Sequence, residues 1–212
     1  MTSTPLLVAT TNRGKLAEIR PMLAGLPYEL VTLGDVPGVA EPEETGRTFA
    51  DNARQKALYY AAASGFLTVA EDSGLEIDAL DGAPGVQSAR WHGTDYAVKF
   101  QRIYEQLDAR GLLTSPARFV CALALARDGR VLFEARGTIE GEIAREPRGT
   151  HGFGYDPIFH YPPYGRTLGE VENEEKQAVS HRGAAFRQLA AYLAAHPARP
   201  SHRAGGPAGD VP

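Results

Sequence analysis

Two carboxylates stand side by side at Glu71 and Asp72, directly after the apolar run FLTVA and directly before Ser73 and a glycine. The pattern predicts a buried strand that ends at these acids. Ligands of α/β sheets bind beyond the carboxyl ends of strands. A carboxylate at such an end could hold a metal ion or activate water, while Ser73-Gly74 lets the backbone approach a ligand. Acids that merely solubilise a surface loop would explain the pair equally well.

The segment TTNRGKL (10–16) follows a first apolar strand and opens a helix. A helix N-terminus has free N–H groups and the positive end of the helix dipole, so it suits a phosphate, and Lys15 adds a mobile cation. The segment is not a Walker A loop, which would need a glycine at Ala9 and Ser or Thr at Leu16. An ordinary strand-to-helix turn with an exposed lysine is the alternative.

A second predicted helix (47–65) places Thr48, Asn52 and Lys56 on one polar stripe. The stripe alone favours a solvated helix face over a ligand site. Glu43 and Glu44 precede this helix, where acids commonly just complement the helix dipole. Mg²⁺ prefers one or two carboxylates plus waters and phosphate oxygens, so these acids are also candidate metal ligands.

Two later segments offer groups that could recognise a base. GTHGFGYDPIF (149–159) is rich in glycine and carries Phe153 and Tyr155, on which a base could stack. EEKQAVSHRG (174–183) supplies Lys176, with His181 and Arg182 at a capped helix start, where they could donate hydrogen bonds to a carbonyl. A structural glycine-aromatic loop and a structural histidine are the alternatives.

The bulk composition is that of an ordinary globular protein. The 212 residues are 43% apolar and 23% charged, with 22 basic and 26 acidic residues and a net charge of −4. This mixture does not predict a nucleic-acid-binding surface, and no stretch approaches the roughly 20 apolar residues of a membrane span. The single cysteine excludes an intramolecular disulfide. We therefore expect a cytoplasmic protein without nucleic-acid or membrane partners.

The order of elements predicts one α/β domain over residues 1–196, built on a mixed sheet with a cleft between two lobes. An Asp128-Gly129 turn predicts a hairpin, and the apolar run FVCALALA predicts a central strand. We expect residues 74–94 and 146–165 to be irregular and the tail 197–212 to be disordered. The other expected strands are 6–10, 28–34 and 66–72, and the expected helices are 12–26, 47–65, 95–111 and 180–196. Thr48 and Ser180 are expected to cap the second and the fourth of these helices, and Gly65 to end the second.

Taken together, five segments resemble the inosine triphosphate pyrophosphatase family, whose members hydrolyse non-standard purine nucleoside triphosphates. The segments are TTNRGK, PEETGRTFADNARQKA, AEDSGLEIDALDGAPGVQSAR, GTHGFGYDPIF and EEKQAVSHRG, and the resemblance covers about residues 6–195. It implies an elongated, twisted mixed sheet flanked by helices, with two lobes around a central substrate cleft. It also implies dependence on Mg²⁺ and a homodimer.

The resemblance also assigns roles to particular residues. Asp72 is the implied proton acceptor and a Mg²⁺ ligand beside Glu43, with water attacking the α-phosphorus and Lys15 and Lys56 clamping the leaving pyrophosphate. His181 and Arg182 are expected to donate to the 6-keto group of the base and Phe153 to stack on its ring. The full set of implied substrate-binding residues is Thr10, Thr11, Asn12, Arg13, Gly14, Lys15, Lys56, Ser73, Phe153, Gly154, Tyr155, Asp156, Lys176, His181 and Arg182.

Two other functions remain open. One is a nucleotide pyrophosphatase of different base specificity, for modified pyrimidines or standard nucleotides, against which SHRG and GFGYDP argue. The other is a non-catalytic nucleotide sensor, against which Asp72, Glu43 and Lys15 argue.

Overall fold

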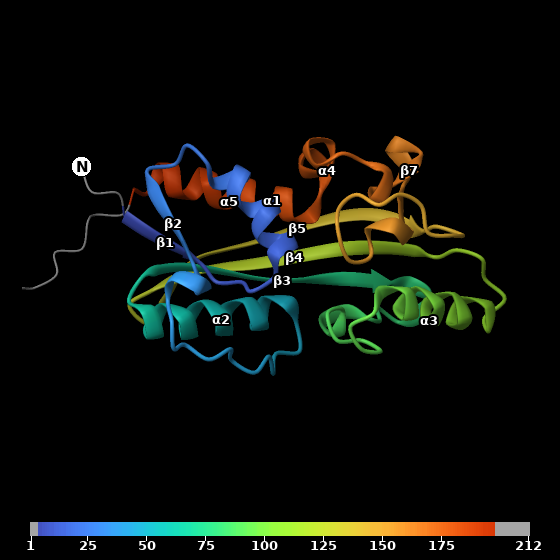
Figure 1. Ribbon diagram of the computed structural model, residues 1–212, viewed down its shortest axis with the longest axis horizontal. Coiled ribbons are helices and arrows are strands. Elements are labelled where there is room, and N and C mark those ends of the chain that lie inside the picture. The colour runs from blue at the N-terminus through green and yellow to red at the C-terminus, as the bar shows by residue number, and fades with distance from the viewer. Residues whose placement is uncertain (1–3, 198–212) are drawn as a thin grey trace, which may run out of the picture.

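A computed structural model describes residues 4–197 and builds them around a mixed sheet of seven strands (Figure 1). The strand order is β2-β1-β3-β4-β5-β6-β7, with β1 parallel to both neighbours and antiparallel pairing from β3 onward. The strands are β1 Thr4–Val8, β2 Tyr28–Thr32, β3 Leu67–Ile77, β4 Pro116–Arg127, β5 Arg130–Ile143, β6 Phe159–Tyr161 and β7 Arg166–Thr167. The helices are α1 Arg13–Leu23, α2 Phe49–Ser64, α3 Tyr96–Asp108, α4 Asn173–Val179 and α5 His181–Ala195.

Helices cover both faces of the sheet, as Figure 1 shows, with α2 and α3 along one face and α1 and α5 on the other. The core follows this arrangement. Buried side chains of β1, β3 and β4 pack against α1 and α5 on one face, while alanines of α2 and β4 fill the other. A third cluster joins α3 to the far ends of β3, β4 and β5. The predicted α/β class with a mixed sheet flanked by helices is confirmed.

Local signals in the sequence set the helix starts. Thr48 accepts a hydrogen bond from the Asp51 N–H at the start of α2, and Ser180 accepts from the Gly183 N–H at the start of α5. Such caps satisfy N–H groups that have no partner inside the helix. Gly65 ends α2 with a φ of 70°, in the left-handed region where glycine carries no steric penalty. The predicted caps and the predicted stop are confirmed.

The predicted hairpin and central strand are also confirmed. Asp128 and Gly129 have φ values of 51° and 73° and connect β4 to β5. Positive φ at both central residues is what a two-residue hairpin turn with the correct twist requires. β4 lies fourth in the order of seven strands, and its residues Phe119–Ala126 are buried.

The prediction that a strand ends at Asp72 is wrong, because β3 continues to Ile77. The long strand β4 pairs with it from Thr68 through Ile77 and so carries it past Gly74. On the other side, β1 pairs only as far as Val69, where the Ala9 N–H donates to the Val69 carbonyl at 2.8 Å. The two acids therefore lie just past the end of β1, in the middle of their own strand.

Two further expectations differ from the structure. The predicted irregular segment 146–165 contains the short strand β6, and α4 forms within residues 173–179, which the sequence did not predict as a helix. The expected disordered tail falls, from residue 198 on, outside the described residues, and the division into two lobes stays a prediction. Between residues 4 and 197, no helix is both long enough and apolar enough to span a membrane.

Candidate active site

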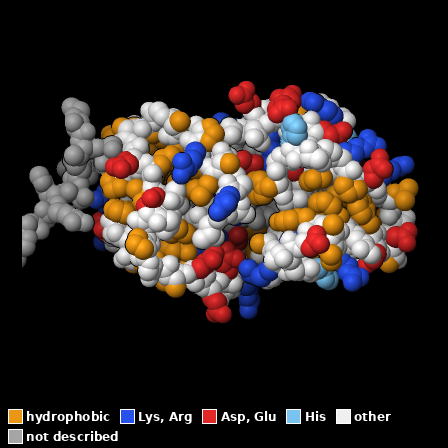
Figure 2. All heavy atoms as spheres, viewed as in Figure 1, with side chains coloured by type: hydrophobic (Ala, Val, Ile, Leu, Met, Phe, Trp, Pro, Cys, Tyr) orange, Lys and Arg blue, Asp and Glu red, His pale blue; other side chains and the backbone are white. Residues whose placement is uncertain are grey.

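A cavity of about 300 Å³ lies where β1 ends beside β3. Figure 2 shows acidic and basic side chains gathered at the lower edge of the molecule, between its left and right halves. All of the predicted site residues line the cavity except Arg13, Gly14 and Glu43. The lining residues among them are Thr10, Thr11, Asn12, Lys15, Lys56, Asp72, Ser73, Phe153, Gly154, Tyr155, Asp156, Lys176, His181 and Arg182.

Asp72 faces α2 and is held by three groups. The Asn52 side-chain amide donates to its Oδ2 at 2.9 Å, the Ser73 N–H donates to its Oδ1 at 3.0 Å, and Lys56 Nζ lies 3.7 Å from Oδ1. Burial raises the pKa of Asp72, and the positive charge of Lys56 only partly opposes this. A buried carboxylate with a raised pKa, held in place by two neutral donors and one nearby cation, is suited to accept a proton.

Two of the three residues on the polar stripe of α2, Asn52 and Lys56, are turned toward Asp72, and Lys56 lines the cavity. Asn52 is fully buried and Lys56 is 9% exposed, so the solvated-face interpretation is wrong for these two residues. Thr48, which caps the helix, is exposed. The stripe is buried because its amide and ammonium groups find a carboxylate partner, Asp72, on the neighbouring strand.

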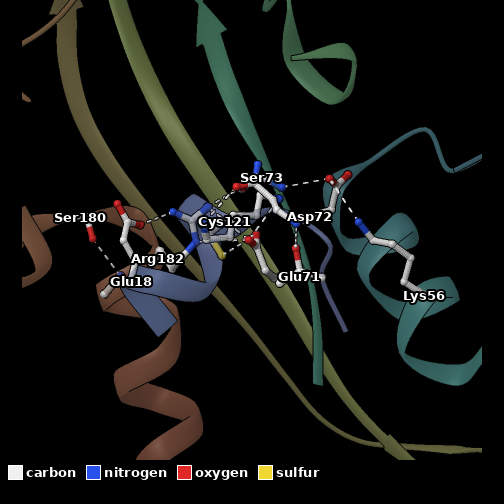
Figure 3. A network of polar contacts seen from close by, with 12 residues as sticks. Glu18, Lys56, Glu71, Asp72, Ser73, Cys121, Ser180 and Arg182 are labelled. Atoms are coloured by element: carbon white, nitrogen blue, oxygen red, sulfur yellow. Dashed lines mark hydrogen bonds and ion pairs between the residues drawn. The ribbon is translucent and has the colours of Figure 1, made fainter. Parts of the chain in front are cut away.

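Glu71 points away from Asp72, to the other face of the sheet, since successive side chains of a strand alternate. Its carboxylate lies 3.1 Å from Lys15 Nζ and 3.2 Å from the Arg182 guanidinium (Figure 3). Burial alone would raise the pKa of Glu71, but Arg182 and Lys15 outweigh burial and hold it well below its ordinary range. Glu71 therefore remains charged and positions two cations that border the cavity.

A buried chain of ion pairs continues from Arg182. Its guanidinium also contacts Glu18 and donates to Ser73 Oγ at 2.9 Å, and Glu18 in turn pairs with Lys176 at 2.7 Å. Lys176 completes the chain with an ion pair to Asp156, whose carboxylate accepts from the Phe153 N–H at 2.7 Å. The chain thus fixes the aromatic loop to α1, α4 and α5.

Aromatic side chains form another part of the wall. The Phe153 ring lies 5.0 Å from Lys176 Nζ and 5.6 Å from the Arg182 guanidinium carbon. The same ring rests on Gly14, where an added Cβ would come within 2.7 Å of Phe153 Cδ1. Gly14 therefore serves the site by letting Phe153 approach the first turn of α1, although it does not itself line the cavity.

His181 is buried and stacks on Phe119, with ring centroids 4.9 Å apart and an interplanar angle of 14°. Burial, and then the nearby charges of Arg182 and Lys176, hold the pKa of His181 well below its usual value, so its imidazole is neutral at pH 7. Among the described residues, nothing hydrogen-bonds to its Nδ1. A neutral imidazole has one donor and one acceptor, so His181 retains polar capacity for a ligand.

The structure brings to the cavity and to its buried ion pairs several side chains that the sequence analysis did not identify. Glu18 follows Lys15 by three residues on α1, which the helical period could have indicated, but only the fold shows that it is buried. Arg90 and Tyr96 lie in the segment predicted to be irregular and at the start of the next helix, and both line the cavity.

The fold and the cavity define an α/β protein whose polar pocket is suited to a nucleotide, since it combines a helix N-terminus, buried lysines, a buried carboxylate and an aromatic wall. The chain belongs to the Ham1 family, whose sequence profile matches residues 6–192. This confirms the resemblance found in the motifs.

Individual relatives cover nearly the whole chain. A dITP/XTP pyrophosphatase from an Exiguobacterium strain is 47% identical over 188 residues, which cover 89% of this chain and 96% of that protein. A HAM1 protein from Coxiella burnetii has a solved structure with a TM-score of 0.84, 41% identity and coverage of 91% of this chain and 99% of the other. The nucleoside-triphosphatase / dITP/XTP pyrophosphatase structure from Mycobacterium abscessus gives a TM-score of 0.69 at 44% identity, with 90% and 99% covered.

Proposed function

We propose that this chain hydrolyses the non-standard purine nucleoside triphosphates dITP, ITP and XTP to the nucleoside monophosphate and pyrophosphate, and so removes them from the nucleotide pool. The observation that carries the proposal is Asp72, a buried carboxylate with a raised pKa beside Lys56, in the same cavity as the N-terminus of α1. Its curated relatives named dITP/XTP pyrophosphatase support the substrate class.

In the proposed reaction the triphosphate lies at the N-terminus of α1, along Thr10 to Lys15, where free N–H groups favour anions. Asp72 accepts a proton from a water molecule, and the resulting hydroxide attacks the α-phosphorus. The bond from this phosphorus to the bridging oxygen breaks, and pyrophosphate leaves with the charge it gains. Lys15 and Lys56 stabilise that charge from fixed positions.

The base is proposed to stack on Phe153, with the remaining polar capacity of His181 directed at its 6-keto edge. Adenine carries an amino donor at that position, so a donor there disfavours it. A site that leaves buried polar groups unpaired can reject the wrong base by roughly 10⁴-fold. Guanine shares the keto group, and we propose that the loop around Phe153 excludes its 2-amino group.

The products distinguish this reaction from other triphosphate hydrolyses. Attack at the α-phosphorus predicts that dITP yields dIMP and pyrophosphate, and that ITP yields IMP and pyrophosphate. Ion-exchange chromatography of the products with a pyrophosphate-specific assay measures this. Diphosphate plus orthophosphate as first products would contradict it. A panel that includes GTP, ATP and modified pyrimidine triphosphates tests the alternative base specificity, and the absence of all turnover would favour a nucleotide sensor.

We also propose that Mg²⁺ is the cofactor, and the donor set fits it. Within residues 4–197 there is no cluster of three or more His, Cys, Asp or Glu side chains that could hold a metal by themselves. Mg²⁺ needs only one or two carboxylates when substrate oxygens and water complete its shell. Asp72 and Glu44 meet this need, since the Lys56 ammonium already lies between them, 3.7 Å from Asp72 and 2.6 Å from Glu44. When bound, the ion would neutralise charge on the phosphates.

The resemblance assigns the second metal carboxylate to Glu43, whereas the structure places Glu43 in an exposed position and Glu44 in the cavity wall. The pair Glu43→Gln and Glu44→Gln decides between them. We expect Glu44→Gln to raise the Mg²⁺ concentration for half-maximal turnover by about tenfold, the equivalent of about 1.4 kcal/mol. Glu43→Gln should leave it within about twofold, as expected of an exposed residue. The opposite order in a Mg²⁺ titration would assign the metal to Glu43.

The oligomeric state and location are also proposals. The family resemblance supports a homodimer, which size-exclusion chromatography with light scattering would detect as twice the mass of the 22.8 kDa chain. A cytoplasmic location agrees with a substrate drawn from the nucleotide pool, and cell fractionation tests it.

A further inference from the structure

Arg90 is a cation at the cavity that the proposed reaction does not use. It lies between β3 and α3, lines the cavity, and its side chain is 46% exposed. Its Nε donates to the Gln87 side chain at 2.7 Å, and its Nη1 lies 2.8 Å from Glu44 Oε2. Two contacts therefore hold the Arg90 side chain at the cavity, and only the one with Glu44 is an ion pair.

The Glu44 carboxylate is shared between Arg90 and a second cation. Lys56 Nζ lies 2.6 Å from Glu44 Oε1, while Arg90 approaches the other oxygen. Two cations from separate segments, one on α2 and one after β3, thus converge on a single oxyanion. A phosphoryl group presents the same kind of oxygens to a guanidinium and an ammonium. Both cations can therefore hold an oxyanion at this point of the cavity, and a phosphoryl group beside Glu44 would draw Arg90 away and leave the carboxylate to Mg²⁺.

The other cations of the cavity are less free to move. Lys176 and Arg182 are buried, and each bridges two acids. Lys15 is paired with the buried Glu71. Arg90 differs because its ion pair is partly exposed, and such pairs contribute little to stability. Its guanidinium can leave Glu44 for a phosphate at small loss, and a bidentate arginine–phosphate contact is among the stronger polar contacts of proteins.

We propose that Arg90 is a substrate-binding residue that exchanges Glu44 for the β- and γ-phosphoryl oxygens, and therefore also binds the pyrophosphate product. The assignment to the pyrophosphate portion follows from Lys56, the proposed clamp of the leaving pyrophosphate, which shares Glu44 with Arg90. This inference rests on the proposed function and adds to it the residue that holds the leaving group.

The test compares two ligands, each of which corresponds to one part of the substrate. Calorimetric titration measures binding of pyrophosphate with Mg²⁺, and separately of IMP, to the wild type, Arg90→Ala and Arg90→Lys. We expect Arg90→Ala to weaken pyrophosphate binding by about 10- to 100-fold, typical of a lost charged hydrogen bond, and to leave IMP binding within about twofold. Arg90→Lys should bind pyrophosphate with an affinity between those of the wild type and Arg90→Ala, because lysine keeps the positive charge and lacks the planar guanidinium.

Arg102→Ala is the matched control, because Arg102 is a comparably exposed arginine with one acidic partner, on α3 and outside the cavity lining. It should bind both ligands as the wild type does. The inference is overturned if the wild type does not bind pyrophosphate, if Arg90→Ala binds it unchanged, or if IMP binding falls by the same factor. Pyrophosphate release from dITP by the wild type is measured in parallel. Its absence would reject the proposed function, whereas wild-type turnover with unchanged binding by Arg90→Ala rejects this inference alone.

Discussion

Asp72→Asn is expected to lower kcat for dITP by about 10²–10⁴-fold, the usual loss when a general base is removed. The substitution keeps the size of the side chain and removes its charge, its basicity and its capacity to hold Mg²⁺. Steady-state release of pyrophosphate from dITP measures the loss. Retention of turnover within about tenfold of the wild type, a loss smaller than base removal produces, would assign the base to another carboxylate.

The same variant should remain folded, which separates catalysis from stability. Burial raises the pKa of Asp72, so the folded protein holds its charged form at a disadvantage that a neutral amide removes. Against this, Asn52 and the Ser73 N–H donate to different oxygens of Asp72, and an asparagine replaces one of these oxygens with an NH₂ donor, so one of the two contacts is lost. We expect these effects to offset, with a melting temperature close to that of the wild type. Asp108→Asn, at an exposed position outside the cavity lining, is the control for both measurements.

The parts of the fold that depend on neighbouring residues could be predicted from the sequence. The cap at Thr48, the left-handed stop at Gly65 and the Asp128-Gly129 turn are local signals, and each occurs where expected. The end of β3 could not be predicted in this way. Whether a strand continues past Gly74 depends on a partner, and the partners of Gly74 and Ile77 are Val120 and Ala117 on β4.

The residues of the site also separate into those that local sequence patterns predict and those that only the fold brings together. Motifs indicated most of the cavity lining, because residues such as Lys15 and Phe153 stand in segments with a recognisable pattern. Patterns do not show which way a polar stripe faces, so Asn52 and Lys56 could equally have been solvated. Sequence patterns also do not show which charged side chains form ion pairs. Lys176 and Arg182 follow Glu18 by about 160 residues along the chain, and only the fold brings Glu18 between them.

This pairing changes what is expected of Arg182. The sequence predicts that Arg182 donates to the 6-keto group, so that Arg182→Ala would lower ITP and XTP turnover far more than ATP turnover. In the structure Arg182 is 1% exposed, and its guanidinium already donates to Glu18, Glu71 and Ser73. Few N–H groups remain for a base. We therefore expect kcat/KM for ITP, XTP, GTP and ATP to fall by a similar factor, and a selective loss of ITP and XTP would restore the base-reading role.

Stability is where removal of Arg182 should have its largest effect. Arg182→Met leaves Glu18 and Glu71 with one buried cation fewer, and breaking a buried ion pair from one side costs about 3–5 kcal/mol. At about 2–4 °C per kcal/mol for a chain of this size, the melting temperature should fall by roughly 6–20 °C. Arg187→Met, at an exposed position of the same helix, should change it little. Adding Glu71→Gln to Arg182→Met should recover part of the loss, since the double variant no longer buries an unpaired carboxylate.

The pH dependence of this loss distinguishes a charge effect from a packing effect. In the wild type the pKa of Glu71 lies below its ordinary value of 4.5, because Arg182 and Lys15 outweigh its burial. The stability gained from Glu71 is therefore complete above about pH 4.5 and is lost as the pH falls toward the folded-state pKa. Without Arg182, burial raises the pKa of Glu71, and the carboxyl accepts a proton at a higher pH. The difference in unfolding free energy between the wild type and Arg182→Met should then be largest near pH 7 and narrow as the pH falls through 4.5, as measured by urea denaturation at several pH values. A difference that stays constant with pH would mean that the loss of packing around the Arg182 side chain, and not its charge, explains the instability.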